Sequence, residues 1–136
     1  MNKLDARRLT GINVIWHAPG AIVDVALDEQ DDATQICAVW QSNVRSLLEA
    51  VGWSHHKTTH HRFVGGLALA ISAPIDALYA AVEIAEWAWD VTEQTMAGTD
   101  TGKNLESSAE HFRQMIRDEQ NPELIRLAED AARHQV

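Results

Sequence analysis

The chain has 136 residues, of which 46% are hydrophobic, and a formal net charge of −9 from 20 acidic and 11 basic side chains. This length suffices for one domain whose core needs no metal or disulfide. The acidic balance argues against binding to nucleic acids or anionic membranes, which requires clustered Lys and Arg. We therefore expect neither nucleic-acid nor membrane partners.

The cysteine content and the apolar segments indicate a cytoplasmic location. Cys37 is the only cysteine and cannot form an internal disulfide, which favours a reducing compartment. The N-terminal MNKLDARRLTG lacks the apolar segment of a signal peptide. The longest apolar-rich stretch, 63–89, is interrupted by Gly, Pro and acidic residues, so we do not expect it to span a membrane.

The first half of the chain predicts two strands and a helix. Residues 8–16 and 20–27 have strand character and are joined by a Pro-Gly turn. Asp31-Asp32 then offers a helix N-cap, and Gly52 suits the end of that helix. Apolar residues at helical spacing lie between them: Ile36, Val39, Trp40, Val44, Leu47, Leu48 and Val51.

The second half predicts a hairpin followed by helices. Residues 53–62 and 63–72 are expected to form strands, and a long helix should begin at Pro74 or Ile75. A loop, a helix over 105–118 and another from Asn121 follow. This order predicts an α+β fold: a small antiparallel or mixed sheet of about four strands packed against two helices, with a helical C-terminus. We assign 1–98 to the core domain and 99–136 to a helical extension that packs on the same domain.

The long helix carries a polar row on an otherwise apolar surface. Its members are Asp76, Tyr79, Glu83, Glu86 and Asp90. Their spacing of three or four residues places them along one side of the helix. Buried carboxylates are costly unless they are paired, hydrated or bound to a ligand. The row is therefore either a solvent-facing surface or a cleft wall for a cationic or peptide-like ligand, where paired carboxylates would also suit acid–base chemistry.

Tryptophan is frequent in this chain. The five residues, most of which fall on apolar phases, are Trp16, Trp40, Trp53, Trp87 and Trp89. Core packing accounts for most of them, but Trp87 and Trp89 point to different helix faces. We therefore include Trp87 among the candidate partner contacts.

The histidine cluster over 55–61, HHKTTHH, is the candidate metal site. If the segment is a strand, His56 and His60 share one face, and His55 and His61 share the other. Ligands four residues apart in a strand are about 13 Å apart, too far for one ion unless a turn intervenes. His56, His60 and His61 remain metal candidates, but we predict no bound metal or other cofactor.

Two other patterns are incomplete. AGTDTGKN over 97–104 resembles a phosphate loop, but Ala97 replaces the first glycine, Asn104 replaces the Mg²⁺-binding hydroxyl, and the preceding element is helical. Ser54 or Ser72 could pair with a histidine, yet neither lies in a G-x-S-x-G elbow. These gaps favour a non-catalytic protein.

Three segments together resemble the N-terminal domain of cyanophycin-synthetase-like Mur ligase proteins. They are RLTGIN at 8–13, Gly65-Gly66 and APIDALYA at 73–80. The resemblance covers roughly residues 5–95, although Ile12 stands where the family often has proline. It implies a domain that precedes an ATP-dependent amide ligase, here detached from the ligase module, and it makes Asn13 a candidate ligand contact.

In some of those proteins the corresponding helix carries an H-x-x-E-H metallopeptidase motif. That motif places two imidazoles on one helical face beside a glutamate general base. Our alignment puts Glu83 at the glutamate, with Ala80 and Ile84 at the histidine positions. Glu83 is therefore the only catalytic candidate, and a zinc hydrolase would need ligands from 55–61.

Three hypotheses follow from the sequence. The first is a non-catalytic accessory or substrate-presenting domain that works with a Mur-type amide ligase, in trans or fused, on an amino-acid or peptide-like substrate. Its contact residues would be Asn13, Asp76, Tyr79, Glu83, Glu86 and Trp87. The second is a small metal-dependent amide or peptide hydrolase. The third is a homo-oligomeric interaction protein that assembles through its C-terminal helix.

Overall fold

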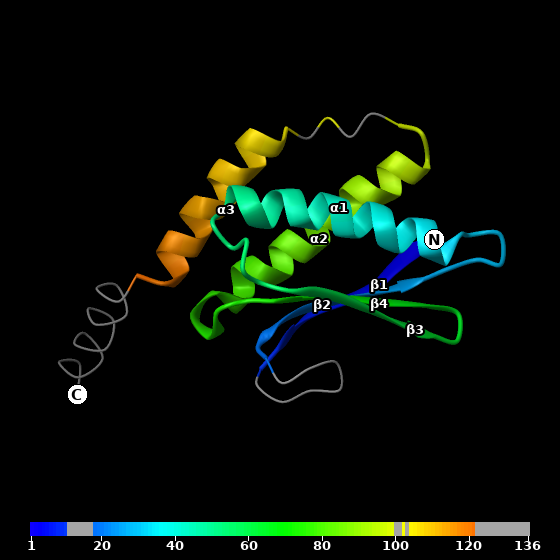
Figure 1. Ribbon diagram of the computed structural model, residues 1–136, viewed down its shortest axis with the longest axis horizontal. Coiled ribbons are helices and arrows are strands. Elements are labelled where there is room, and N and C mark those ends of the chain that lie inside the picture. Colours follow the sequence, from blue (N-terminus) through cyan, green and yellow to red (C-terminus); the bar gives the residue numbers. More distant parts are fainter. Residues whose placement is uncertain (11–17, 100–101, 103, 122–136) are drawn as a thin grey trace, which may run out of the picture.

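The fold is a single four-stranded antiparallel sheet with helices, which confirms the α+β class (Figure 1). The computed structural model describes residues 1–10, 18–99, 102 and 104–121. The strands have the spatial order β1-β2-β4-β3. In chain order the elements are β1 (Asn2–Leu9), β2 (Gly20–Ala26), α1 (Ala33–Ala50), β3 (Thr58–Phe63), β4 (Gly66–Ser72), a 3₁₀ turn (Ile75–Ala77), α2 (Leu78–Met96) and α3 (Leu105–Glu119).

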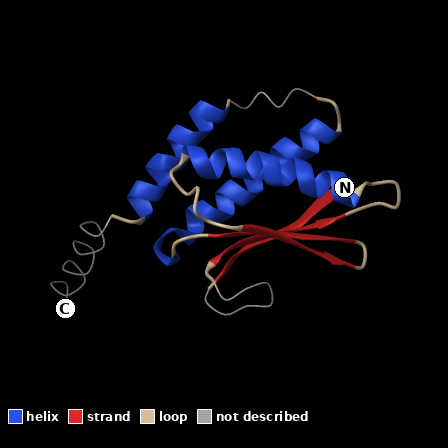
Figure 2. Cartoon of the chain, viewed as in Figure 1, coloured by secondary structure: helices blue, strands red, loops and turns tan. Residues whose placement is uncertain are grey.

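Helices α1 and α2 lie on the same face of the sheet, and α3 packs against both of them (Figure 2). Helix α2 contacts β1, β2 and β4, whereas α1 contacts β3. The sheet therefore has two different edges: β1 lies on the α2 side, and β3 lies on the α1 side.

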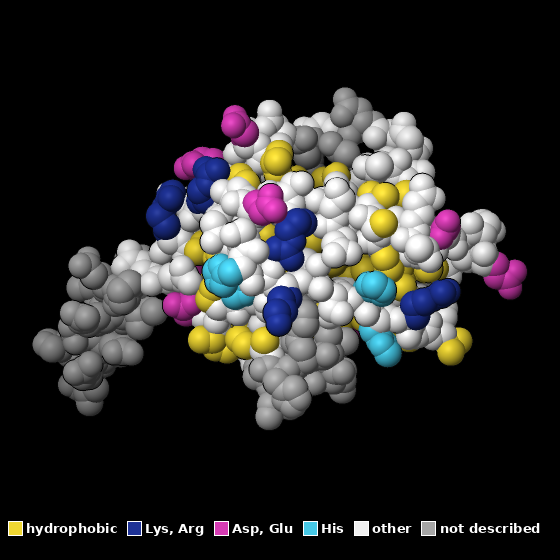
Figure 3. Space-filling view, in the orientation of Figure 1, with side chains coloured by type: hydrophobic (Ala, Val, Ile, Leu, Met, Phe, Trp, Pro, Cys, Tyr) yellow, Lys and Arg dark blue, Asp and Glu magenta, His cyan; other side chains and the backbone are white. Residues whose placement is uncertain are grey.

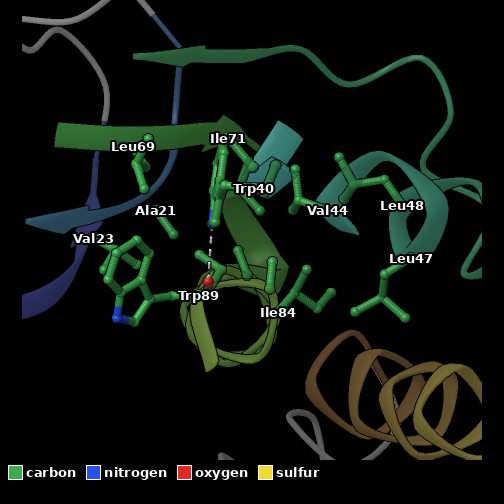
Figure 4. Close-up of a cluster of buried hydrophobic side chains, with 14 of the residues drawn as sticks. Ala21, Val23, Trp40, Val44, Leu47, Leu48, Leu69, Ile71, Ile84 and Trp89 are labelled. Carbon is green, nitrogen blue, oxygen red and sulfur yellow. Dashed lines mark hydrogen bonds between the residues drawn. The ribbon is translucent and has the colours of Figure 1, made fainter. Parts of the chain in front are cut away.

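The core fills the space between this sheet face and the helices (Figure 4). Alternate residues of β2 and β4, such as Val23 and Leu69, point into it, and α1 and α2 contribute Trp40 and Ile84. The Trp40 indole N–H is directed at the Ala85 carbonyl at 3.5 Å. Each large side chain of this kind contributes about 1.5–3 kcal/mol before entropy is subtracted.

Local signals placed most element ends correctly. The Asp32 carboxylate accepts the Gln35 N–H at 3.1 Å at the start of α1, as the N-cap prediction requires. Gly52 has a φ of 87° just beyond the helix, a conformation that favours glycine. Helix α3 begins where expected, because Asn104 accepts the N–H groups of Glu106 and Ser107.

The first strand was misplaced. It was predicted over 8–16, but β1 runs from Asn2 to Leu9; residues 11–17 lie outside the described part of the chain. Strand β1 is an edge strand that carries Lys3, Asp5 and Arg7. Charged side chains suit an edge because they discourage pairing with other sheets, but they also hide the apolar alternation that marks a strand.

The hairpin was predicted correctly, but its strands are shorter than expected. Strand β3 begins at Thr58 rather than Trp53, because Trp53 is buried in the core and its carbonyl accepts the His56 N–H in a turn. Strand β4 begins at Gly66, after a two-residue connection in which Gly65 has a φ of 84°. The long helix α2 begins at Leu78 rather than at Pro74 or Ile75, because a 3₁₀ turn over Ile75–Ala77 precedes it. The helix predicted from Asn121 falls on residues 122–136, outside the described part of the chain.

Candidate functional site

The polar row on α2 faces solvent rather than the core. Asp76 and Tyr79 are exposed, and Glu83, Glu86 and Asp90 are half-buried, so none of these carboxylates is fully buried. Of the two alternatives, a solvent-facing surface or a cleft wall, the row is therefore a solvent-facing surface. Its carboxylates need no buried ion-pair partner.

Lys3 of β1 is the cation beside this row, and sequence reasoning missed it. Its ammonium forms an ion pair and hydrogen bond with Glu86. That hydrogen bond raises the pKa of Lys3, and the charges of Asp90 and Glu83 raise it further. Lys3 and Glu86 are 83 positions apart in sequence, so only the packing of α2 over β1 shows the contact.

The C-terminal end of α3 covers the beginning of α2. The Glu119 carboxylate accepts the backbone N–H groups of Tyr79 and Ala80, both at 2.9 Å, and Gln120 donates to Asp76 at 2.8 Å. The N-cap residue of α2, Ala77, makes no side-chain capping hydrogen bond, so Glu119 supplies the missing acceptor. The side chains of Ile75 and Tyr79 remain 62% and 60% exposed beside this contact.

Glu83 differs in burial from its two aligned metal-ligand positions. Ala80 and Ile84 are fully buried in the core, whereas Glu83 is half-buried. Among the residues that the structure describes, no group of three His, Cys, Asp or Glu side chains has an arrangement that could hold a metal ion.

Trp87 faces α3. Its indole N–H donates to the Ser108 hydroxyl at 3.0 Å, and it borders a hollow of about 210 Å³ with Asn43, Val91 and Leu105. Trp40, Trp53 and Trp89 are buried, and the Trp89 indole N–H has no hydrogen-bond partner within the described structure. The predicted contact Asn13, like Trp16, lies outside the described residues.

The histidines do not have the strand arrangement that was predicted. His55 and His56 precede β3, so His56 and His60 do not share a strand face. Within β3, His60 pairs with Leu69 and His61 with Ala68. Because Leu69 points into the core, His60 lies on the helix-covered face and His61 on the opposite face.

His56 is joined to Ser72 at the end of β4. Its Nδ1 is 3.0 Å from the Ser72 hydroxyl, which also accepts the Lys57 N–H at 2.9 Å. Since that hydroxyl already accepts one hydrogen bond, its own proton can be donated to a neutral imidazole. Burial lowers the pKa of His56, and the nearby His55 and Arg45 lower it further.

This depressed pKa predicts a loss of stability in acid. Below the ordinary histidine pKa of 6.5 the unfolded chain protonates His56 before the folded protein does. The stabilising contribution is therefore complete above that value and is lost as the pH falls through the folded-state pKa. We expect His56→Gln to lose less stability than the wild type between about pH 7 and pH 5 in urea unfolding experiments. Parallel pH profiles would contradict this assignment.

A groove separates α1 from β3. Two adjoining hollows of about 170 and 200 Å³ share Cys37, Gln41 and His60. A third, of about 230 Å³, continues past Ala33 and Arg62 towards the β3–β4 turn. Small residues on the side of α1 next to β3 leave this space open: Ala33, Thr34, Cys37 and Ala38. Burial raises the pKa of the Cys37 thiol, so the thiol stays protonated and is a poor nucleophile.

The segment that contains β3 carries no carboxylate. No Asp or Glu occurs between Glu49 and Asp76, a segment that contains Lys57, Arg62 and four of the seven histidines. On the face shown in Figure 3, the histidine side chains and some of the basic ones lie across the lower half, and further basic side chains lie at the upper left close to acidic ones. The carboxylates of α2 lie near β1, at the opposite edge.

No helix in the described part of the chain combines the length and apolar character needed to cross a membrane. No family model matches the chain, and neither a curated protein nor a solved structure matches it.

Proposed function

We propose that this protein is a non-catalytic accessory domain that works with a Mur-type amide ligase on an amino-acid or peptide-like substrate. The observation that carries the proposal is the exposed corner at the start of α2. Residues 73–80, which carry part of the sequence resemblance, place Ile75 and Tyr79 in solvent there. Exposed aromatic and aliphatic side chains on a rigid support are typical anchors of protein interfaces.

The structure supports a fixed surface at this corner. Glu119 holds the backbone of Tyr79 and Ala80, and Gln120 holds Asp76, so α3 restrains the segment from outside. A preorganised surface loses less entropy on binding than a mobile one. The carboxylates of Glu83 and Glu86 extend the same side of α2 and could contact the substrate or the ligase.

The chemistry of the other candidates agrees with a binding role. The buried thiol of Cys37 is protonated, and the two positions aligned with metal ligands hold Ala80 and Ile84. The single cysteine also suits a cytoplasmic location, where such a ligase would have ATP.

The test is a binding and activity experiment with the Mur-type ligase encoded nearest to this chain. We expect the two proteins to co-purify and the ligation rate to rise when this chain is added. Ile75→Ala/Tyr79→Ala should weaken the association roughly tenfold. The matched control is Leu4→Ala, which removes a side chain of similar exposure, 58%, from β1. Absence of co-purification together with an unchanged ligation rate would refute the proposal.

A further inference from the structure

The outer edge of β3 is unpaired in the described structure. Strand β3 pairs with β4 alone, at the end of the order β1-β2-β4-β3. Phe63 and Gly66 flank a two-residue turn, which makes them a hydrogen-bonded pair. Alternation along the ladder then directs the backbone N–H and C=O groups of Thr58, His60 and Arg62 away from the sheet.

The same three residues border the groove beside α1. Thr58, His60 and Arg62 lie on the helix-covered side of β3, opposite Cys37 and Gln41. An added strand would therefore find free backbone partners at the edge and space for alternate side chains next to α1. These two features are what β-strand addition requires: backbone bonds supply affinity and pockets supply specificity.

Charge indicates which strand fits. Lys57, His60, His61 and Arg62 are exposed along the edge, and residues 50–75 contain no acidic side chain. Asp28, Glu29 and Asp31 line the third hollow near Arg62, so the acid-free part of the edge is the end at Lys57. Charges are screened over about 8 Å at physiological salt. The nearby basic side chains therefore affect the binding of a strand here more strongly than the protein's net charge of −9 does. A second copy paired through β3 would place basic strands side by side, which is unfavourable.

We propose that β3 binds an extended acidic peptide segment of another protein as a fifth strand of the sheet. Carboxylates of the added strand would lie near Lys57, on the sheet face opposite the helices, and small apolar side chains would enter the groove beside Cys37. This surface lies at the sheet edge opposite the α2 carboxylates, so the inference goes beyond the proposed function and does not require the ligase.

The test uses the whole chain and a fluorescein-labelled peptide of about ten alternating Glu and Val residues. Fluorescence anisotropy should show binding that weakens when salt is raised from about 0.15 to 0.5 M. Lys57→Glu should weaken binding roughly tenfold. Arg117→Glu makes the same charge change on α3 and should leave binding unchanged.

A backbone variant separates strand addition from general charge attraction. His60→Pro removes one outward N–H, which an edge strand tolerates, and should abolish binding while near-UV circular dichroism stays native. His61→Ala is its control, because the backbone of His61 faces β4. Equal binding of a Lys-Val peptide, or unaltered binding by both His60→Pro and the charge-reversed variant, would overturn the proposal. So would assembly of the free protein in sedimentation experiments that His60→Pro abolishes, since a second copy would then occupy the edge.

Discussion

Gly66→Ala is expected to lower the free energy of unfolding by about 3 kcal/mol. A Cβ atom at this position would lie 2.1 Å from the Val25 carbonyl oxygen and 2.6 Å from a ring carbon of Phe63. The Val25 carbonyl belongs to the neighbouring central strand, so it cannot move without breaking the β2–β4 pairing. Urea unfolding followed by tryptophan fluorescence measures the loss.

The preceding glycine is the matched control for this experiment. A Cβ atom on Gly65 would meet nothing within 4 Å, but its φ of 84° disfavours other residues. Gly65→Ala should therefore cost only about 1 kcal/mol. Equal losses for the two variants would show that the structure accommodates a Cβ at Gly66, and that the close approach of β2 is not the reason for glycine there.

Glu119→Ala is expected to destabilise the protein by about 2 kcal/mol. The substitution leaves the N–H groups of Tyr79 and Ala80 without their acceptor at the start of α2, where Ala77 offers no side-chain cap. It also removes a negative charge from the positive end of a helix dipole. The free energy of unfolding from urea titrations tests the expected loss.

The neighbouring acid supplies the control for Glu119. Asp118 is exposed on α3 and pairs only with Gln114 of the same helix among the hydrogen bonds that the described structure shows. Asp118→Ala should change stability by less than about 0.5 kcal/mol. If both variants were equally destabilised, general charge on α3 would explain the effect and the capping role of Glu119 would be wrong.

Helix α3 therefore stabilises both helices of the layer below it. Glu119 caps the beginning of α2, and the Arg113 guanidinium donates to the Ala50 carbonyl at the end of α1, at 3.0 Å. Each charge suits the helix terminus that it meets: a carboxylate at the N-terminus and a cation at the C-terminus. Loss of either contact would also loosen the exposed corner of Ile75 and Tyr79 to which we assign ligase binding.

The sequence by itself determined the elements whose signals are local. The apolar period from Ile36 to Leu48, the cap at Asp32 and the glycine after the helix placed α1 correctly. Gly65 likewise placed the β3–β4 turn. Such signals need only the residues of one turn or one helix face, because capping and backbone conformation are short-range effects.

Only the tertiary structure decided where those elements meet. The contacts of Lys3 with Glu86, of Glu119 with α2 and of His56 with Ser72 join residues far apart in sequence. The groove beside β3 exists because α2 covers the centre of the sheet and α1 leaves the β3 edge partly uncovered. Pairing order and helix placement are set by long-range packing, so the sequence could not place the α2 carboxylates and the β3 groove at opposite edges of the sheet.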